Sequence, residues 1–166
     1  VGLSVSGAND PSNQKYGVYT INEDDYMWGQ GTNDYYTISG VTIDQHEDIV
    51  KNTAVKLKNY LDAKLSQGFN KPIFIVSHLA LNYSLRTYKD GDGKYARYIF
   101  DVVNNAASSG LNIIFLFGHN HSHGWDNYLG GANVYLKPGD TMPISVCGDR
   151  SQATNVTLNF TYMDAG

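Results

Sequence analysis

The sequence predicts an α/β fold in which a parallel sheet is layered with helices and short antiparallel strands close the domain. Two continuous apolar runs, at residues 73–77 and 112–117, are typical of strands that are buried on both faces. A helical pattern lies between them, and shorter alternating runs follow towards the C-terminus. A chain of 166 residues, 42% of them hydrophobic, is long enough for one such domain, and we expect residues 1–166 to form it.

The first forty residues predict loops and short strands, of which residues 16–21 are the best strand and residues 22–25 a polar turn. A long helix is then predicted from Asp44, because apolar residues recur along one face at spacings of 4, 3, 4 and 4. These residues are Val50, Ala54, Leu57, Leu61 and Leu65. Asp44 and Glu47 resemble a capping box, and Gly68 is a fitting stop for the helix.

A second helix is predicted after the glycine- and aspartate-rich turn at residues 90–93, with its end near Gly110. Its apolar side comprises Tyr95, Ile99, Val102, Val103 and Ala106. Because this helix connects the two apolar runs, strand, helix and strand should form a βαβ unit with parallel, adjacent strands. Three shorter runs predict closing antiparallel strands, at residues 132–137, 142–147 and 155–162.

The composition excludes several classes of protein. Thirteen tyrosines and only 17% charged residues indicate a globular chain rather than a disordered one. No run approaches the roughly 20 apolar residues of a membrane-spanning helix, so we expect no membrane partner. The 12 Lys and Arg residues form no basic stripe, so we expect no nucleic-acid partner. The single cysteine, Cys147, is interpreted as a packing residue, and the high Asn, Gly and Tyr content suits a secreted or cell-surface protein.

Three histidines fall where the predicted parallel strands end. His78 follows the run at residues 73–77, while His119 and His121 follow the run at residues 112–117. Ligands of open α/β sheets bind at the carboxyl edge, where these side chains should gather. Residues two apart in extended chain point to the same side, so His119 and His121 would present two imidazoles together. Histidine nitrogen is a common ligand of transition metals, and the sequence therefore predicts a metal site.

The alternative interpretation is that the His-Asn-His segment is a solvated loop. It is the conjunction with a second histidine at a strand end that favours the metal site. His123 lies two residues after His121, so in extended chain it would point to the same side as His119 and His121. Trp125 and Tyr128 follow closely. These three residues are therefore placed to touch a substrate or to pack over the site. His46, in the first turn of the long helix, is interpreted as an exposed or capping residue.

The Val-Ser-His segment at residues 76–78 and the Phe-Gly-His-Asn-His segment at 117–121 resemble the last two signature blocks of the calcineurin-like metallophosphoesterases. The resemblance spans nearly the whole chain and implies the C-terminal half of a four-layer αββα sandwich. It also implies that His78 and His119 bind the second of two metal ions, and His121 the first. The implied reaction is attack of metal-activated hydroxide on a phosphoester substrate, with two Mn, Fe or Zn ions about 3.5–4 Å apart.

The sequence departs from the family pattern in its first three blocks. Gly-Asp-x-x-Asp and Gly-Asn-His-Asp/Glu are missing from the 166 residues, and the Asp-Gln-His triplet at residues 44–46 begins the predicted long helix instead of following a strand as the Asp-x-His block does. The segment at 7–10 is closest to the third block but lacks its histidine. We therefore expect a fragment whose partner is the N-terminal half of a longer polypeptide, with no catalytic residue identified here. Three imidazoles supply no negative charge, so the fragment should hold at most one weakly bound metal ion and be nearly inactive alone. Its exposed sheet edge and apolar faces favour homo-oligomers.

Two other functions stay open at the level of sequence. One is a non-catalytic binding module of the same fold, recognising a carbohydrate or a protein through an aromatic cluster. The cluster comprises Tyr16, Tyr19, Tyr26, Trp28, Tyr35 and Tyr36. The other is a nickel- or zinc-binding protein of an unrelated fold. The substrate itself depends on loops and capping elements that the motifs do not specify.

Overall fold

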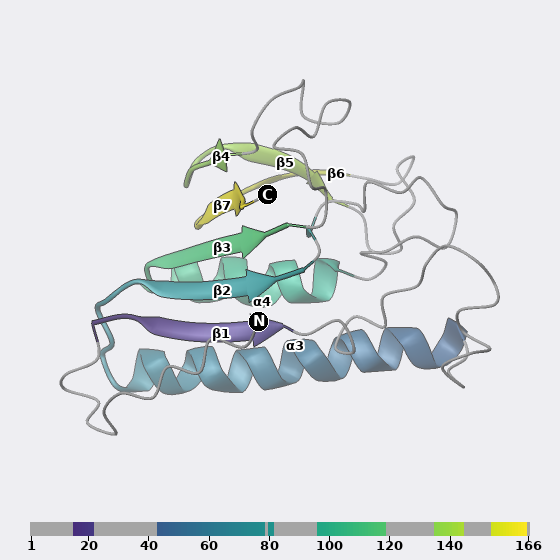
Figure 1. Cartoon of the computed structure of the whole chain (residues 1–166), viewed down its shortest axis with the longest axis horizontal. Helices are drawn as coiled ribbons and strands as arrows, with labels where there is room; N and C mark the ends of the chain where they lie inside the picture. The colour runs from purple at the N-terminus through teal and green to yellow at the C-terminus, as the bar shows by residue number, and fades with distance from the viewer. Residues whose placement is uncertain are drawn as a thin grey trace.

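The computed structural model describes residues 15–21, 43–78, 80–81, 96–118, 135–144 and 154–165 (Figure 1). These residues form two helices, a five-stranded sheet and a separate two-stranded sheet. In chain order the elements are β1 (Gly17–Ile21), α3 (Ile43–Ser66), β2 (Ile73–Ser77), α4 (Arg97–Ser108), β3 (Ile113–Phe117), β4 (Tyr135–Leu136), β5 (Thr141–Ile144), β6 (Thr154–Thr157) and β7 (Thr161–Asp164). The predicted α/β class, with a mostly parallel sheet, is therefore confirmed.

The larger sheet has the strand order β1-β2-β3-β7-β4. The predicted βαβ unit is present, because β2 and β3 lie parallel and α4 connects them. The strand predicted near residues 16–21 forms β1, which lies parallel to β2 on its other side. Both connections step across the sheet in the same direction, so right-handed crossovers put α3 and α4 on one face. The two helices pack against each other there.

The long helix follows its predicted pattern. Val50, Leu57 and Leu61 have no exposed surface, because their spacing of about 3.6 residues turns them all towards the sheet. The helix ends at Ser66, and Gly68 in the turn after it has a φ of +62°, a left-handed conformation that glycine adopts without steric cost. The Phe69 amide then donates to the Lys64 carbonyl over 3.0 Å and turns the chain towards β2.

The closing strands differ in part from the prediction. β4 and β7 are antiparallel, as are β5 and β6, but β7 lies parallel to β3 within the main sheet. The single run predicted at residues 155–162 is divided into β6 and β7, because Leu158 and Phe160 both turn into the core. The Asn104 side chain of α4 stabilises this turn by accepting a hydrogen bond of 2.7 Å from the Asn159 amide.

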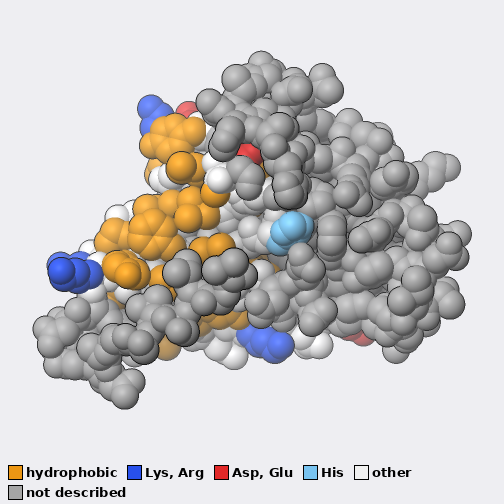
Figure 2. Space-filling model, viewed as in Figure 1, with side chains coloured by type: hydrophobic (Ala, Val, Ile, Leu, Met, Phe, Trp, Pro, Cys, Tyr) orange, Lys and Arg blue, Asp and Glu red, His pale blue; other side chains and the backbone are white. Residues whose placement is uncertain are grey.

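The two faces of the main sheet differ in coverage. In β2, Ile73, Ile75 and Ser77 are buried, while Phe74 and Val76 lie on the opposite face. Figure 2 shows this second face, where apolar side chains gather over the sheet. The exposed fractions of Val18, Val76 and Met163 on it are 41%, 38% and 39%. We call this surface, made of Tyr16, Val18, Phe74, Val76 and Met163, the open face.

Neither of the two helices in the described part of the chain is long and apolar enough to cross a membrane.

Candidate functional site at the carboxyl edge of the sheet

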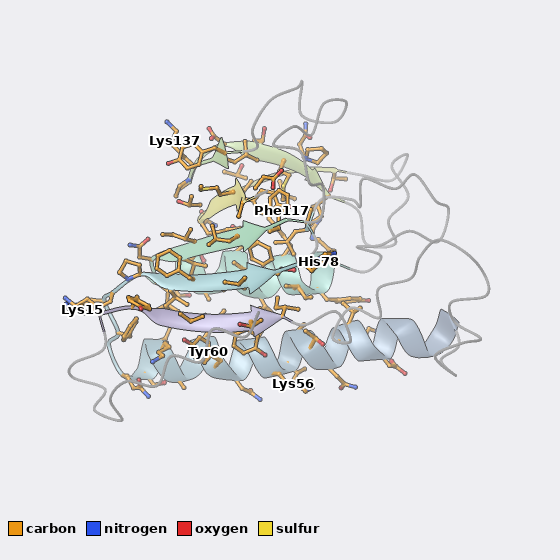
Figure 3. The ribbon with its side chains drawn as sticks, in the orientation of Figure 1. Lys15, Lys56, Tyr60, His78, Phe117 and Lys137 are labelled. Carbon is orange, nitrogen blue, oxygen red and sulfur yellow. The ribbon has the colours of Figure 1, made fainter. Side chains whose placement is uncertain are left out.

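Three parallel strands end together at the carboxyl edge of the sheet. The register pairs Val76 of β2 with Leu116 of β3, and Phe117 of β3 with Asp164 of β7. His78 follows β2 directly, and Figure 3 shows it beside the end of β3, near Phe117. The apolar strands are held by the core, so the residues after them are presented at a defined position.

Backbone hydrogen bonds continue this alignment past the strand ends. The Gly118 amide donates to the His78 carbonyl over 3.3 Å, and the Ala165 amide donates to the Phe117 carbonyl over 2.7 Å. The backbone of His78 is therefore bonded directly to the residue that precedes His119 in the sequence. The half-buried side chain of His78 lies at this edge.

The chain after His78 is anchored to the closing strand. The Leu81 amide donates a buried hydrogen bond of 2.7 Å to the hydroxyl oxygen of Tyr162 in β7. The Tyr162 ring in turn stacks on Phe117, with ring centroids 4.6 Å apart and an interplanar angle of 24°. Ala80 and Leu81 are both buried. The segment that carries His78 is thus fixed at both ends, by β2 before it and by β7 after it.

Asp164 is a residue of this edge that the sequence analysis missed. It is the last residue of β7, it pairs with Phe117, and its Oδ2 atom is buried. The alternation of apolar residues ends the predicted strand at Tyr162, so Asp164 was left outside it. The sequence did contain a signal for Asp164, because this carboxylate follows an apolar run in the same way as His78 follows the run that forms β2.

The other predicted site residues lie outside the described residues. These are the expected metal ligands His119 and His121, and the expected substrate contacts His123, Trp125 and Tyr128. Within the described part of the chain, no group of three or more His, Cys, Asp and Glu side chains lies close enough to hold a metal ion. His78 and Asp164 are nevertheless suitable donors, since imidazole nitrogen and carboxylate oxygen both bind divalent transition metals.

A shifted pKa occurs at the opposite, amino edge of the sheet. Burial raises the pKa of Tyr60 in α3 above its ordinary value of 10.0, and a hydrogen bond with the Val18 backbone lowers it in part. The Tyr60 hydroxyl lies against Gly17 at the start of β1. This shift is a consequence of helix packing on β1 and does not involve the carboxyl edge.

No protein-family model matches the chain, and no curated protein matches it. The resemblance to metallophosphoesterases therefore rests on the two histidine motifs.

Proposed function

We propose that the chain is part of a metal-dependent phosphoester hydrolase of the calcineurin-like kind, in which it contributes the histidine ligands. The hydrogen bond between the Gly118 amide and the His78 carbonyl carries this proposal. It joins the ends of the two histidine motifs across adjacent parallel strands, so that His78 and the His119-Asn120-His121 segment start from neighbouring backbone positions. Without this pairing, two motifs some forty residues apart in the sequence would not be expected to contribute to the same site.

The roles proposed for the residues follow from their chemistry. His78, His119 and His121 donate imidazole nitrogen to divalent metal ions, of which the complete site would hold two, as Mn, Fe or Zn. His123, Trp125 and Tyr128 contact the phosphoester substrate. Bound metal ions supply a Lewis acid for the phosphoryl oxygen and lower the pKa of a bound water. The chain itself contributes positioning, because the backbone around His78 is tied to β3 and β7.

The open face supports the finer architecture that we propose, a four-layer αββα sandwich. Parallel sheets are normally covered on both faces. Here the helices cover one face, while the other presents apolar side chains such as Val18 and Val76, which are 41% and 38% exposed. Sheets that pack face to face, about 10 Å apart, interdigitate side chains of this kind. The partner that fits this face is a second sheet, supplied by the N-terminal half of a longer polypeptide.

The proposal is tested by metal content and hydrolysis of a generic aryl phosphate in the presence of Mn²⁺. The 166-residue chain should bind at most one ion weakly and be nearly inactive. A longer protein that includes Asp-x-His and Gly-Asp-x-x-Asp blocks upstream should bind two ions and turn over. In both proteins, His78→Ala should weaken Mn²⁺ binding by at least about tenfold. His46→Ala, the same change in a histidine of α3, should leave it unchanged.

Two results would contradict the proposal. One is an upstream coding sequence without the acidic blocks, and the other is unchanged Mn²⁺ affinity in the His78→Ala variant. Either result would favour the alternative function, a carbohydrate- or protein-binding module. Two residues of its aromatic cluster face apart, however, because the Tyr16 ring contacts Phe74 of the open face and the Tyr19 ring contacts Tyr60 of α3.

A further inference from the structure

We infer that Tyr162 is a positioning residue for the metal site, because its hydroxyl oxygen holds the segment after His78 and so keeps the His78 imidazole in place for a divalent cation. This inference rests on the proposed function, since it concerns how one ligand of that metal site is held. It assigns Tyr162 no contact with the ion itself. The hydrogen bonds that follow His78 and the packing of the tyrosine ring support it.

Two hydrogen bonds hold the chain where it leaves β2. The His78 carbonyl accepts from the Gly118 amide at 3.3 Å, which is longer than the usual range of about 2.7–3.2 Å. The Leu81 amide donates to the Tyr162 hydroxyl oxygen at 2.7 Å in a buried environment, where hydrogen bonds are stronger than in water. The bond to Tyr162 is therefore the stronger of these two, and it lies three residues after the histidine.

The Tyr162 ring is held by close packing, which makes its hydroxyl a fixed anchor. Tyr162 has no exposed surface, and it pairs with Phe115 in the register between β3 and β7. Its ring stacks on Phe117 with centroids 4.6 Å apart, and it lies edge-on to Phe160 with centroids 6.3 Å apart. Because such a core leaves the ring little room, the hydroxyl restrains the segment that it binds.

The core itself does not need a hydroxyl group at position 162. Three aromatic neighbours of Tyr162 are phenylalanines, namely Phe115, Phe117 and Phe160. A phenylalanine at position 162 would bury the same apolar ring without burying a polar atom, which is costly unless it is hydrogen-bonded. The hydroxyl therefore adds a link to the buried Leu81 amide that a phenylalanine would not provide.

This link should change the affinity for a cation. His78 is half-buried at the carboxyl edge, beside the end of β3 (Figure 3). A ligand whose backbone is already ordered loses little conformational freedom when an ion binds, whereas a loosened segment has to be ordered at that moment. Loss of the Tyr162 hydroxyl should therefore weaken binding of a divalent cation by about three- to tenfold.

The experiment is a titration of the 166-residue chain with Mn²⁺, in which free Mn²⁺ is measured by its electron paramagnetic resonance signal. Tyr162→Phe should raise the Kd for Mn²⁺ by about three- to tenfold. Hydrogen exchange of the Leu81 amide should become faster in this variant, because the amide loses its acceptor.

Gly17→Ala is the matched control for a general loss of stability. Its methyl group would lie 2.8 Å from the Tyr60 hydroxyl oxygen, so it destabilises the chain at the amino edge, away from His78. This variant should leave the Kd for Mn²⁺ unchanged. A Gly17→Ala variant that weakens Mn²⁺ binding as much as Tyr162→Phe does would overturn the inference, because the effect would then be one of stability.

The other outcomes separate this inference from the proposed function. If His78→Ala weakens Mn²⁺ binding and Tyr162→Phe changes the Kd by less than about twofold, Tyr162 is no positioning residue and the histidine site stands. If the unsubstituted chain binds no Mn²⁺ at millimolar concentrations, the inference is overturned, while the activity of the longer protein still tests the proposed function.

Ala80→Gly replaces Tyr162→Phe if that variant does not fold. Ala80 lies between His78 and Leu81, and glycine loosens the backbone there without changing the Tyr162 ring. It should also raise the Kd for Mn²⁺, and an unchanged Kd would overturn the inference.

Discussion

The Tyr162 hydroxyl shows how one buried polar atom positions the candidate site. It accepts the Leu81 amide hydrogen bond at 2.7 Å, while the ring lies against Phe117 and Phe115. The aromatic ring stabilises the core, and the hydroxyl binds the segment that follows His78. Packing and positioning are therefore carried by different atoms of the same side chain.

Replacing Tyr162 with Phe should separate these two contributions. The variant retains the ring contacts but leaves the buried Leu81 amide without its acceptor, which costs about 1–3 kcal/mol in the free energy of unfolding. Chemical denaturation measures this change. Tyr135→Phe is the control, because Tyr135 is 55% exposed and its variant should unfold like the unsubstituted chain. Equal stability of the two variants would show that the hydrogen bond does not hold the segment.

At the amino edge of the sheet, strand β1 and helix α3 are in close contact. A Cβ atom added to Gly17 would lie 2.8 Å from the Tyr60 hydroxyl oxygen and 3.2 Å from Ile73 Cγ1. Glycine is required at this position by the approach of the helix, not by its backbone conformation. The Gly17 amide meanwhile donates to the Pro72 carbonyl over 2.8 Å and fixes the register of β1 on β2.

We expect Gly17→Ala to destabilise the chain by about 1–3 kcal/mol, because the methyl group overpacks the contact between β1 and α3. The cost should be smaller in a Tyr60→Phe background, where the hydroxyl oxygen nearest the new methyl group is gone. Thermal unfolding of the four proteins forms a double-mutant cycle. Additive effects would show that the hydroxyl is not the source of the clash.

At the scale of the whole molecule, the sheet is covered by helices on one face and carries exposed apolar side chains on the other. Val76 is 38% exposed near the middle of this open face, between β1 and β3. Burying apolar surface stabilises an assembly by about 25 cal/mol per Å², so contact between open faces is favourable. When the sheet that we propose for the N-terminal half of the longer polypeptide is not supplied, a second copy of the chain should cover the open face instead.

Light scattering should therefore detect dimers or larger species of the 166-residue chain. Val76→Thr keeps a β-branched side chain in the strand but makes the open face more polar, and it should shift the population towards monomer. Val55→Thr makes the same change at an exposed position of α3, where Val55 is 55% exposed. It should leave the mass distribution unchanged. A monodisperse monomer of the unsubstituted chain would argue against the proposal that the chain is the C-terminal half of a larger domain.

Local patterns were sufficient for much of the fold. The helix α3 follows from a period of about 3.6 between Val50 and Leu61, and its end follows from Gly68. β2 and β3 follow from apolar runs, and their parallel pairing follows from the helix between them. The position of His78 at the carboxyl edge follows from the same unit, because every residue after a parallel strand lies at that edge.

Local sequence patterns could not predict how strands that are far apart in the chain pair with one another. Residues 154–164 have no sequence feature that distinguishes an antiparallel partner from a parallel one. The choice depends on the fit of Tyr162 against Phe117 and on the turn that Asn104 stabilises. The prediction consequently missed the parallel pairing of β7 with β3, and with it the place of Asp164.

The sequence by itself determined the helices, the two central strands and the edge at which His78 lies, because these depend on periodicity and chain connectivity over fewer than about fifty residues. Only the tertiary structure decided that β7 joins β3, that Tyr162 holds the chain after His78, and that Asp164 lies at the candidate site. These contacts join residues far apart in the chain, and their free energy comes from packing and buried hydrogen bonds that no local pattern encodes.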